Sequence, residues 1–177
     1  MRAWAAAFFA QAESDWPCYQ QLSEKLSLPA CHALHALQMT LEKLGKALRL
    51  AEGSLGPGDV ARSHLGLAKY LQAARFDHEL ASFLGMTRGQ FAAACRQMTP
   101  LVERLERLHP QLASGPNVEY PWARPDGRVV APARFSFGEI NLLRTPSGGK
   151  LLNFSTRVFE YHGQRTFAGK RPNTPCD

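Results

Sequence analysis

The chain has 177 residues, 45% of them hydrophobic, which is typical of one globular domain whose core needs neither disulfides nor metals for stability. Its net charge of +6 at pH 7 favours anionic partners such as nucleic acid, nucleotides or acidic protein surfaces. No run of about 18 apolar residues occurs, which excludes a transmembrane helix, and the amino-terminal apolar run is too short for a usual signal peptide. We therefore expect a cytoplasmic protein that does not associate with membranes.

Two long helices are predicted at the amino-terminal end. The first covers about residues 2–13, and Pro17 either kinks its continuation to Leu26 or opens a second helical segment. The next begins near Pro29 and ends at Gly53, because glycine commonly terminates a helix just after its last turn.

The second of these helices has two organised faces between residues 34 and 48. One face is apolar and is expected to pack in the core: Leu34, Leu37, Leu41, Leu44 and Leu48. The other repeats polar residues at the same spacing: His35, Gln38, Glu42 and Lys46. These polar residues can form a binding surface or only an ordinary solvent-exposed helix surface. In the second case Glu42 and Lys46 form an ion pair of roughly 0.3 kcal/mol.

The rest of the chain is also expected to be mainly helical. Periodic apolar residues predict helices over about 59–74, 78–84, 88–109 and 147–161. Thr87 and Gln90 form a capping box before the third of these helices, Pro100 is expected to bend it, and Pro110 to stop it. Between the last two helices lies an irregular segment rich in proline and glycine, 115–134, with short extended pieces at 129–130 and 135–137. Residues 1–162 are expected to form one domain, and the polar residues 163–177 a poorly ordered tail.

The four cysteines give no sign of a metal or redox site. Cys18, Cys31, Cys95 and Cys176 form no Cys-x-x-Cys pair, so we interpret them as reduced, small apolar residues. Cys31 and His35 are four residues apart, but no second pair accompanies them, and the long helices lack a Glu-x-x-His pair. We expect neither a metal nor a cofactor.

Three motifs in this sequence resemble the HEPN family of small helical-bundle domains. They are His35-x-x-Gln38-x-x-x-Glu42-Lys43-x-x-Lys46-Ala47, then Ser63-His64-Leu65, and later Glu119-Tyr120-Pro121. The resemblance covers about residues 1–160. It implies an all-α fold, an antiparallel bundle of four to five helices that is commonly a homodimer, in agreement with the apolar periodicity.

For function, the resemblance leaves two alternatives, because the family contains both ribonucleases and non-catalytic members. The ribonucleases use an arginine followed after four to six residues by a histidine, and they cleave RNA without a metal. Such a histidine can move the proton of a ribose 2′-hydroxyl while the guanidinium holds the phosphate. Arg104 and His109 match this spacing, although Leu105 stands where a polar residue is common. Complementarity to the helix dipole also accounts for both residues.

A ligand site is predicted where the polar face of the second helix meets the next segment. If His35, Glu42, Lys46 and His64 converge, with Arg62 nearby, they suit a phosphate or a nucleotide. The preferred hypothesis is a non-catalytic HEPN-like dimer that binds a nucleotide or RNA, or that pairs with a nucleotidyltransferase, since the chain has no phosphate-binding loop of its own. The alternative is a metal-independent endoribonuclease, a toxin or defence effector, with Arg104 and His109 as catalytic residues.

Overall fold

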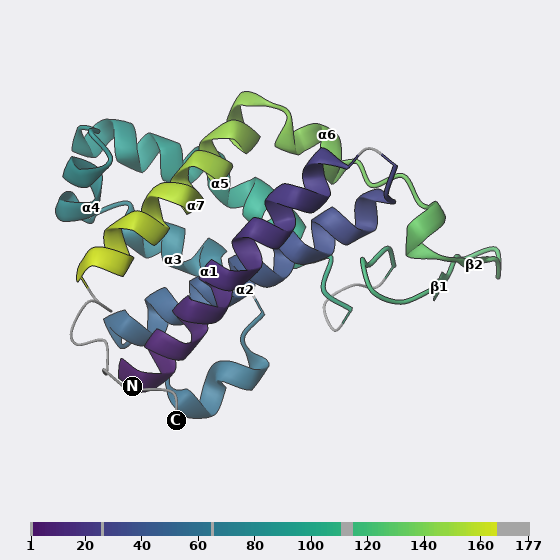
Figure 1. Cartoon of the computed structure of the whole chain (residues 1–177), viewed down its shortest axis with the longest axis horizontal. Coiled ribbons are helices and arrows are strands. Elements are labelled where there is room, and N and C mark those ends of the chain that lie inside the picture. The colour runs from purple at the N-terminus through teal and green to yellow at the C-terminus, as the bar shows by residue number, and fades with distance from the viewer. Residues whose placement is uncertain (1, 26, 65, 111–114, 166–177) are drawn as a thin grey trace, which may run out of the picture.

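The predicted all-α class is confirmed by the structure, a computed structural model that describes residues 2–25, 27–64, 66–110 and 115–165, with only the backbone of residues 57 and 162–165 (Figure 1). None of the helices in these residues has the length and apolar character needed to span a membrane. The elements in chain order are α1 (Arg2–Glu24), α2 (Ala30–Glu52), the 3₁₀ helix η1 (Pro57–Arg62), α3 (Gly66–Ala74), α4 (His78–Phe83), α5 (Arg88–Glu106), β1 (Trp122–Ala123), β2 (Val129–Val130), the 3₁₀ helix η2 (Pro132–Arg134), α6 (Glu139–Leu143) and α7 (Pro146–Arg165).

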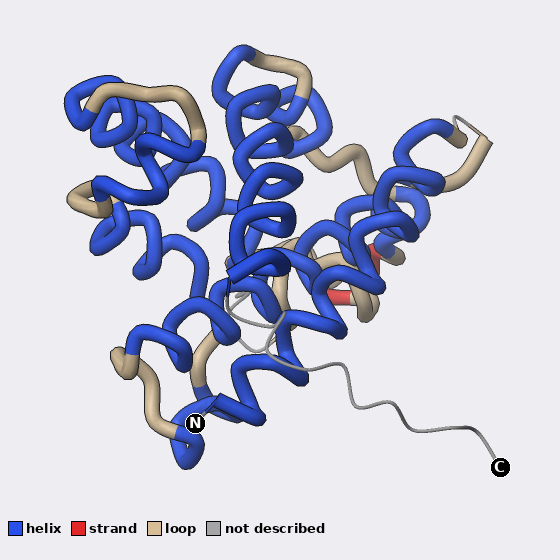
Figure 2. The backbone as a smooth tube through the Cα atoms, turned by 60° about the vertical axis from the view of Figure 1, so that its left-hand side comes forward, coloured by secondary structure: helices blue, strands red, loops and turns tan. Residues whose placement is uncertain are grey.

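Helices α1 and α2 form a long hairpin and lie side by side along their lengths (Figures 1 and 2). Pro17 lies inside α1, so the helix continues to Glu24 as the first alternative had it, and Leu26 lies outside the described residues. Gly53 ends α2 with φ = 77°, a left-handed conformation that glycine adopts without strain. All five leucines of the predicted apolar face are buried in the core.

The predicted single helix over 59–74 is wrong, because the chain forms η1 and then α3 with an extended link between them. The reason is tertiary: the first turn of α3 packs directly onto the backbone of α2. A Cβ on Gly66 would lie only 3.1 Å from the carbonyl carbon of Gly45. The link carries His64 across the middle of α2 and is therefore important for the site described below.

Helix α5 begins at the predicted capping box, in which Thr87 and Gln90 exchange hydrogen bonds with each other's backbone. It contains Pro100 and ends at Glu106, three residues earlier than predicted. The turn that follows is closed by the His109 N–H, which donates to the Glu106 carbonyl at 3.2 Å. His109 therefore lies beyond the helix rather than in its last turn.

The segment before the last helix contains more structure than the sequence predicted. The extended piece at 129–130 is confirmed as β2, which pairs antiparallel with β1 in a hairpin at the edge of the molecule (Figure 1). The extended piece at 135–137 is preceded by η2, and α6 was not predicted. Helix α7 runs to Arg165, so the predicted tail starts within a helix, and residues 166–177 lie outside the described part.

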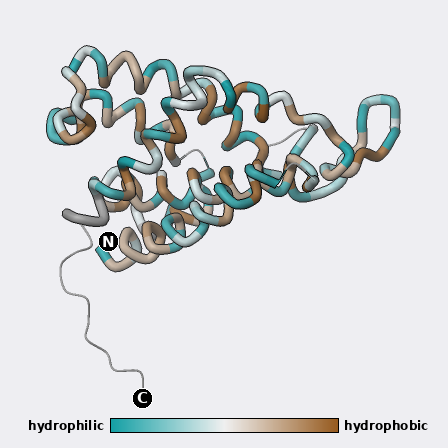
Figure 3. The backbone as a smooth tube through the Cα atoms, turned by 45° about the horizontal axis from the view of Figure 1, so that its top comes forward, coloured by the Kyte–Doolittle hydropathy of each residue, from teal (hydrophilic) through white to brown (hydrophobic). Residues whose placement is uncertain are grey.

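The core lies where α2, α3, α5 and α7 face one another and α1. Hydrophobic and hydrophilic residues are interspersed along the helices, as Figure 3 shows, and the buried apolar ones form the core. Aromatic contacts link the first and last helices: the Phe159 ring lies 5.6 Å from Phe9 and 6.0 Å from Trp16, measured between ring centroids.

Candidate functional site

Three of the four residues on the polar face of α2 are buried and only His35 is partly exposed, so the interpretation as an ordinary exposed surface is wrong for Gln38, Glu42 and Lys46. Gln38 is 0% exposed, Glu42 5% and Lys46 7%, although the helix has a polar sequence there. Burying charged groups is costly unless they are paired and hydrogen-bonded. The partners of these side chains therefore define what the face does.

The carboxylate of Glu42 holds both of its neighbours on α2. Lys46 Nζ donates to Glu42 Oε1 at 2.6 Å, and Gln38 Nε2 donates to Glu42 Oε2 at 3.1 Å. The Lys46 ammonium also lies 5.7 Å from the centroid of the Phe8 ring on α1. The carboxylate and the ammonium balance each other's charge inside the protein.

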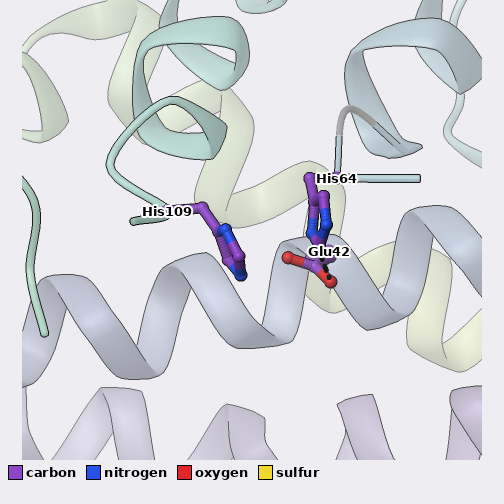
Figure 4. Close-up of side chains that lie close together, drawn as sticks. All are labelled: Glu42, His64 and His109. Carbon is purple, nitrogen blue, oxygen red and sulfur yellow. Dashed lines mark ion pairs between the residues drawn. The ribbon is translucent and has the colours of Figure 1, made fainter. Parts of the chain in front are cut away.

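Two histidines from other parts of the chain lie close to the Glu42 carboxylate (Figure 4). His64, from the link before α3, places Nδ1 3.5 Å from Glu42 Oε1. His109, from the turn after α5, stacks on His64 with ring centroids 4.1 Å apart and an interplanar angle of 25°. We call Gln38, Glu42, Lys46, His64 and His109 the Glu42 cluster.

The imidazole of His64 has unused hydrogen-bonding capacity. Its side chain is only 11% exposed, and neither ring nitrogen has a hydrogen-bond partner among the described residues. The contact with Glu42 is close enough for electrostatic attraction but is not aligned as a hydrogen bond. Buried polar atoms normally have a partner, so the two ring nitrogens of His64 are available to a ligand as far as the described residues go. Burial also lowers the pKa of the neighbouring His109, an effect that Glu42 partly opposes.

The predicted ligand-binding residues are thus only partly brought together. Glu42, Lys46 and His64 meet in the cluster. His35 instead lies beside Glu119, with Nδ1 3.6 Å from its carboxylate, and the exposed Arg62 pairs with Asp59 at 3.2 Å. Leu65, part of the Ser-His-Leu motif, lies outside the described residues.

The predicted catalytic pair is divided between two environments. Arg104 donates to Glu139 on α6 at 2.8 Å, and its side chain is 57% exposed. His109, by contrast, belongs to the Glu42 cluster. Sequence reasoning did not anticipate that the His109 ring stacks on His64.

Comparisons with protein-family models, with curated proteins and with solved structures give no match for this chain. The resemblance to the HEPN family therefore rests on the sequence motifs alone. What the site can do follows from its own geometry.

A second arginine–histidine pair escaped the sequence analysis. Arg157 and His162 on α7 have the same spacing as Arg104 and His109. The guanidinium of Arg157 donates to Glu160 at 2.6 Å and lies 4.8 Å from the Phe83 ring, whereas the side chain of His162 lies outside the described part. A search for every arginine followed by a histidine at this spacing finds both pairs.

Glu106 is a buried carboxyl group that no sequence motif indicated. It is 0% exposed, and its Oε1 accepts the backbone N–H of Leu67 at 2.7 Å, which caps the first turn of α3 from another helix. Burial raises the pKa of Glu106 to about 8, although the N–H groups of Leu67 and Ala68 oppose the shift. Near neutral pH this carboxyl group is therefore largely protonated.

This proton makes stability depend on pH. Between about pH 4.5, the ordinary pKa of the group, and about pH 8, the folded protein holds the proton and the unfolded chain does not. The contribution of this proton to the free energy of unfolding is complete below pH 4.5. It is lost as the pH rises to 8, and the free energy falls by up to about 1.4 kcal/mol per pH unit. We expect Glu106→Gln, whose amide oxygen can still accept from Leu67, to flatten this decline in urea unfolding at pH 5.5, 6.5 and 7.5. Glu103→Gln, on the same helix, is the control, and parallel curves for wild type and Glu106→Gln would contradict the prediction.

Proposed function

We propose that this chain is a HEPN-like helical protein that binds a phosphate group of a nucleotide or of RNA at the Glu42 cluster, without catalysing a reaction on it. The observation that carries the proposal is the buried His64 imidazole, whose two nitrogens lack a hydrogen-bond partner among the described residues. Lys46 and His109 lie beside it, so cationic and hydrogen-bonding groups converge on one position.

The chemistry of these groups suits a phosphate. The Lys46 ammonium has three N–H donors, of which Glu42 engages one, and each imidazole offers at least one N–H donor. The Glu42 carboxylate lies within ion-pair distance of both Lys46 and His64 and so places the ammonium and the imidazole near each other. The positive charge of the whole chain favours the approach of an anion. The homodimer and the nucleotidyltransferase partner implied by the family resemblance stay predictions from the sequence.

A metal-independent endoribonuclease is the second candidate, favoured by the contact of His109 with His64. Two imidazoles beside an ammonium can transfer protons and stabilise charge on a phosphate. In this version Lys46 takes the role that the sequence gave to Arg104, because the Arg104 guanidinium is engaged by Glu139.

The test measures binding of fluorescent ATP and of a labelled single-stranded RNA by anisotropy in the presence of EDTA. Wild type is expected to bind, and Lys46→Ala, His64→Gln and His109→Gln to bind at least about tenfold more weakly, since each removes a hydrogen bond to a charged ligand. His35→Gln lies on the same helix outside the cluster and is expected to bind like wild type. Circular dichroism verifies that every variant is folded.

The state of the RNA after incubation separates the two candidates. Intact RNA supports the non-catalytic proposal, while cleavage that His109→Gln abolishes and Arg104→Ala retains supports the ribonuclease. If wild type and both folded histidine variants bind equally well, the Glu42 cluster is not the binding site, and both candidate functions are contradicted.

A further inference from the structure

The Glu42 cluster also contains the donor set of a metal site. Glu42 on α2, His64 on the link before α3 and His109 after α5 each offer one ligand atom, and these atoms all lie within 4.8 Å of one another. The side chains reach this position from segments far apart in the sequence. Two imidazoles and one carboxylate form a donor set that borderline divalent metals such as Zn²⁺, Co²⁺ and Ni²⁺ favour.

We propose that Glu42, His64 and His109 bind one divalent transition-metal ion. The inference goes beyond the binding of phosphate and does not depend on it. It also differs from the expectation from the sequence that no metal binds, because His64 and His109 belong to no metal-binding motif.

The unused capacity of His64 supports this assignment. A metal ligand must present a free lone pair, and neither ring nitrogen of His64 has a hydrogen-bond partner among the described residues. Glu42 retains lone pairs as well, because each carboxylate oxygen has two and the contacts with Lys46 and Gln38 engage one on each oxygen.

Closing the site requires the two rings to turn rather than the helices to move. Ligands about 2.1 Å from a tetrahedral metal lie roughly 3.4 Å apart, so atoms within 4.8 Å must approach one another by up to about 1.4 Å. The stacked rings of His64 and His109 must also rotate so that their nitrogens point to a common centre. Both histidines lie outside regular helices, in the link and in the turn.

Lys46 is the group that opposes a cation here, because its ammonium lies 2.6 Å from the Glu42 carboxylate. Its long side chain can turn away from the metal and remain beside it. A metal held by three protein ligands keeps open coordination positions, and a phosphate that occupied one could also contact Lys46. Only this contact of a metal-bound phosphate with Lys46 rests on the proposed function.

The test is a titration of the metal-free protein with Co²⁺ alone, without nucleotide or RNA. Co²⁺ bound to nitrogen and oxygen ligands is followed by its visible absorption, and Zn²⁺ is expected to displace it. We expect one Co²⁺ per chain in wild type, and binding roughly 10- to 100-fold weaker, or more so, in His64→Ala and in His109→Ala. His35→Ala and Cys31→Ser remove the pair of possible ligands on α2 and are expected to bind Co²⁺ like wild type.

The two histidine variants test the metal site, because Glu42→Gln changes a buried ion pair and can unfold the protein. Absence of a visible spectrum with wild type, or the same spectrum and affinity in folded His64→Ala, would overturn the metal site. Phosphate binding is measured in EDTA and therefore succeeds or fails independently of this result.

Discussion

Replacing Gly45 with alanine is expected to destabilise the protein by about 3 kcal/mol, the upper part of the range for overpacking a core. Gly45 faces the start of α3, and an added Cβ would lie 2.8 Å from the Leu67 Cα and closer still to the Leu67 nitrogen and the Gly66 carbonyl carbon. All three obstacles are backbone atoms, so no side chain can turn aside to make room. The two helices must separate, which disrupts the packing of α3 on α2.

Thermal unfolding measures this effect. For a domain of this size, about 3 kcal/mol lowers the Tm by roughly 6–12 °C. Gly89→Ala is the matched control, because Gly89 is also helical and a Cβ there meets no atom within 4 Å. That variant is expected to be neutral or slightly stabilised. A Tm for Gly45→Ala equal to that of Gly89→Ala would contradict the close approach of α3 to α2.

Lys46→Met is expected to cost about 3 kcal/mol or more, because it leaves the Glu42 carboxylate buried without its cation. The side chains of Lys46 and Glu42 are only 8% and 7% exposed, so water replaces the lost partner poorly. The double variant Glu42→Gln with Lys46→Met removes both charges and is expected to recover much of the loss. Urea unfolding of wild type, of Glu42→Gln, of Lys46→Met and of the double variant gives the interaction energy between the two side chains.

Lys43→Met provides the comparison for this pair. Lys43 lies on the same helix and pairs with Asp15 of α1 at 2.5 Å, but the two side chains are 20% and 21% exposed. Because water reaches this partly exposed pair, the loss of the Lys43 ammonium is expected to cost less than about 1 kcal/mol. Equal losses for Lys43→Met and Lys46→Met would mean that burial does not strengthen the dependence of Glu42 on Lys46.

The sequence predicted those helices whose ends and apolar faces are determined locally. The leucines of α2, the left-handed Gly53 and the capping box at Thr87 act within one helix, and all three are found as expected. The break between η1 and α3 depends instead on contact between Gly45 and Gly66, which are on different helices. A pattern within one segment cannot reveal that contact, so two elements were predicted as one.

The site was less accessible to sequence reasoning for the same reason. Glu42 and Lys46 are four residues apart, a spacing that occurs equally on exposed helices and buried ones, so their burial could not be read from it. His64 and His109 are far apart in the chain and meet only because α3 and α5 pack together. The spacing rule that selected His109 paired it with Arg104, whereas the fold pairs it with His64.

Glu106 connects the two segments of the chain that carry His64 and His109. It precedes His109 by one helical turn, and through the Leu67 N–H it holds the residue that follows shortly after His64. The Glu106 carboxyl group thus connects the turn that carries His109 to the start of α3, just after His64. A ligand that binds both imidazoles would hold these two segments together, and it is therefore expected to slow the exchange of the Leu67 amide with solvent.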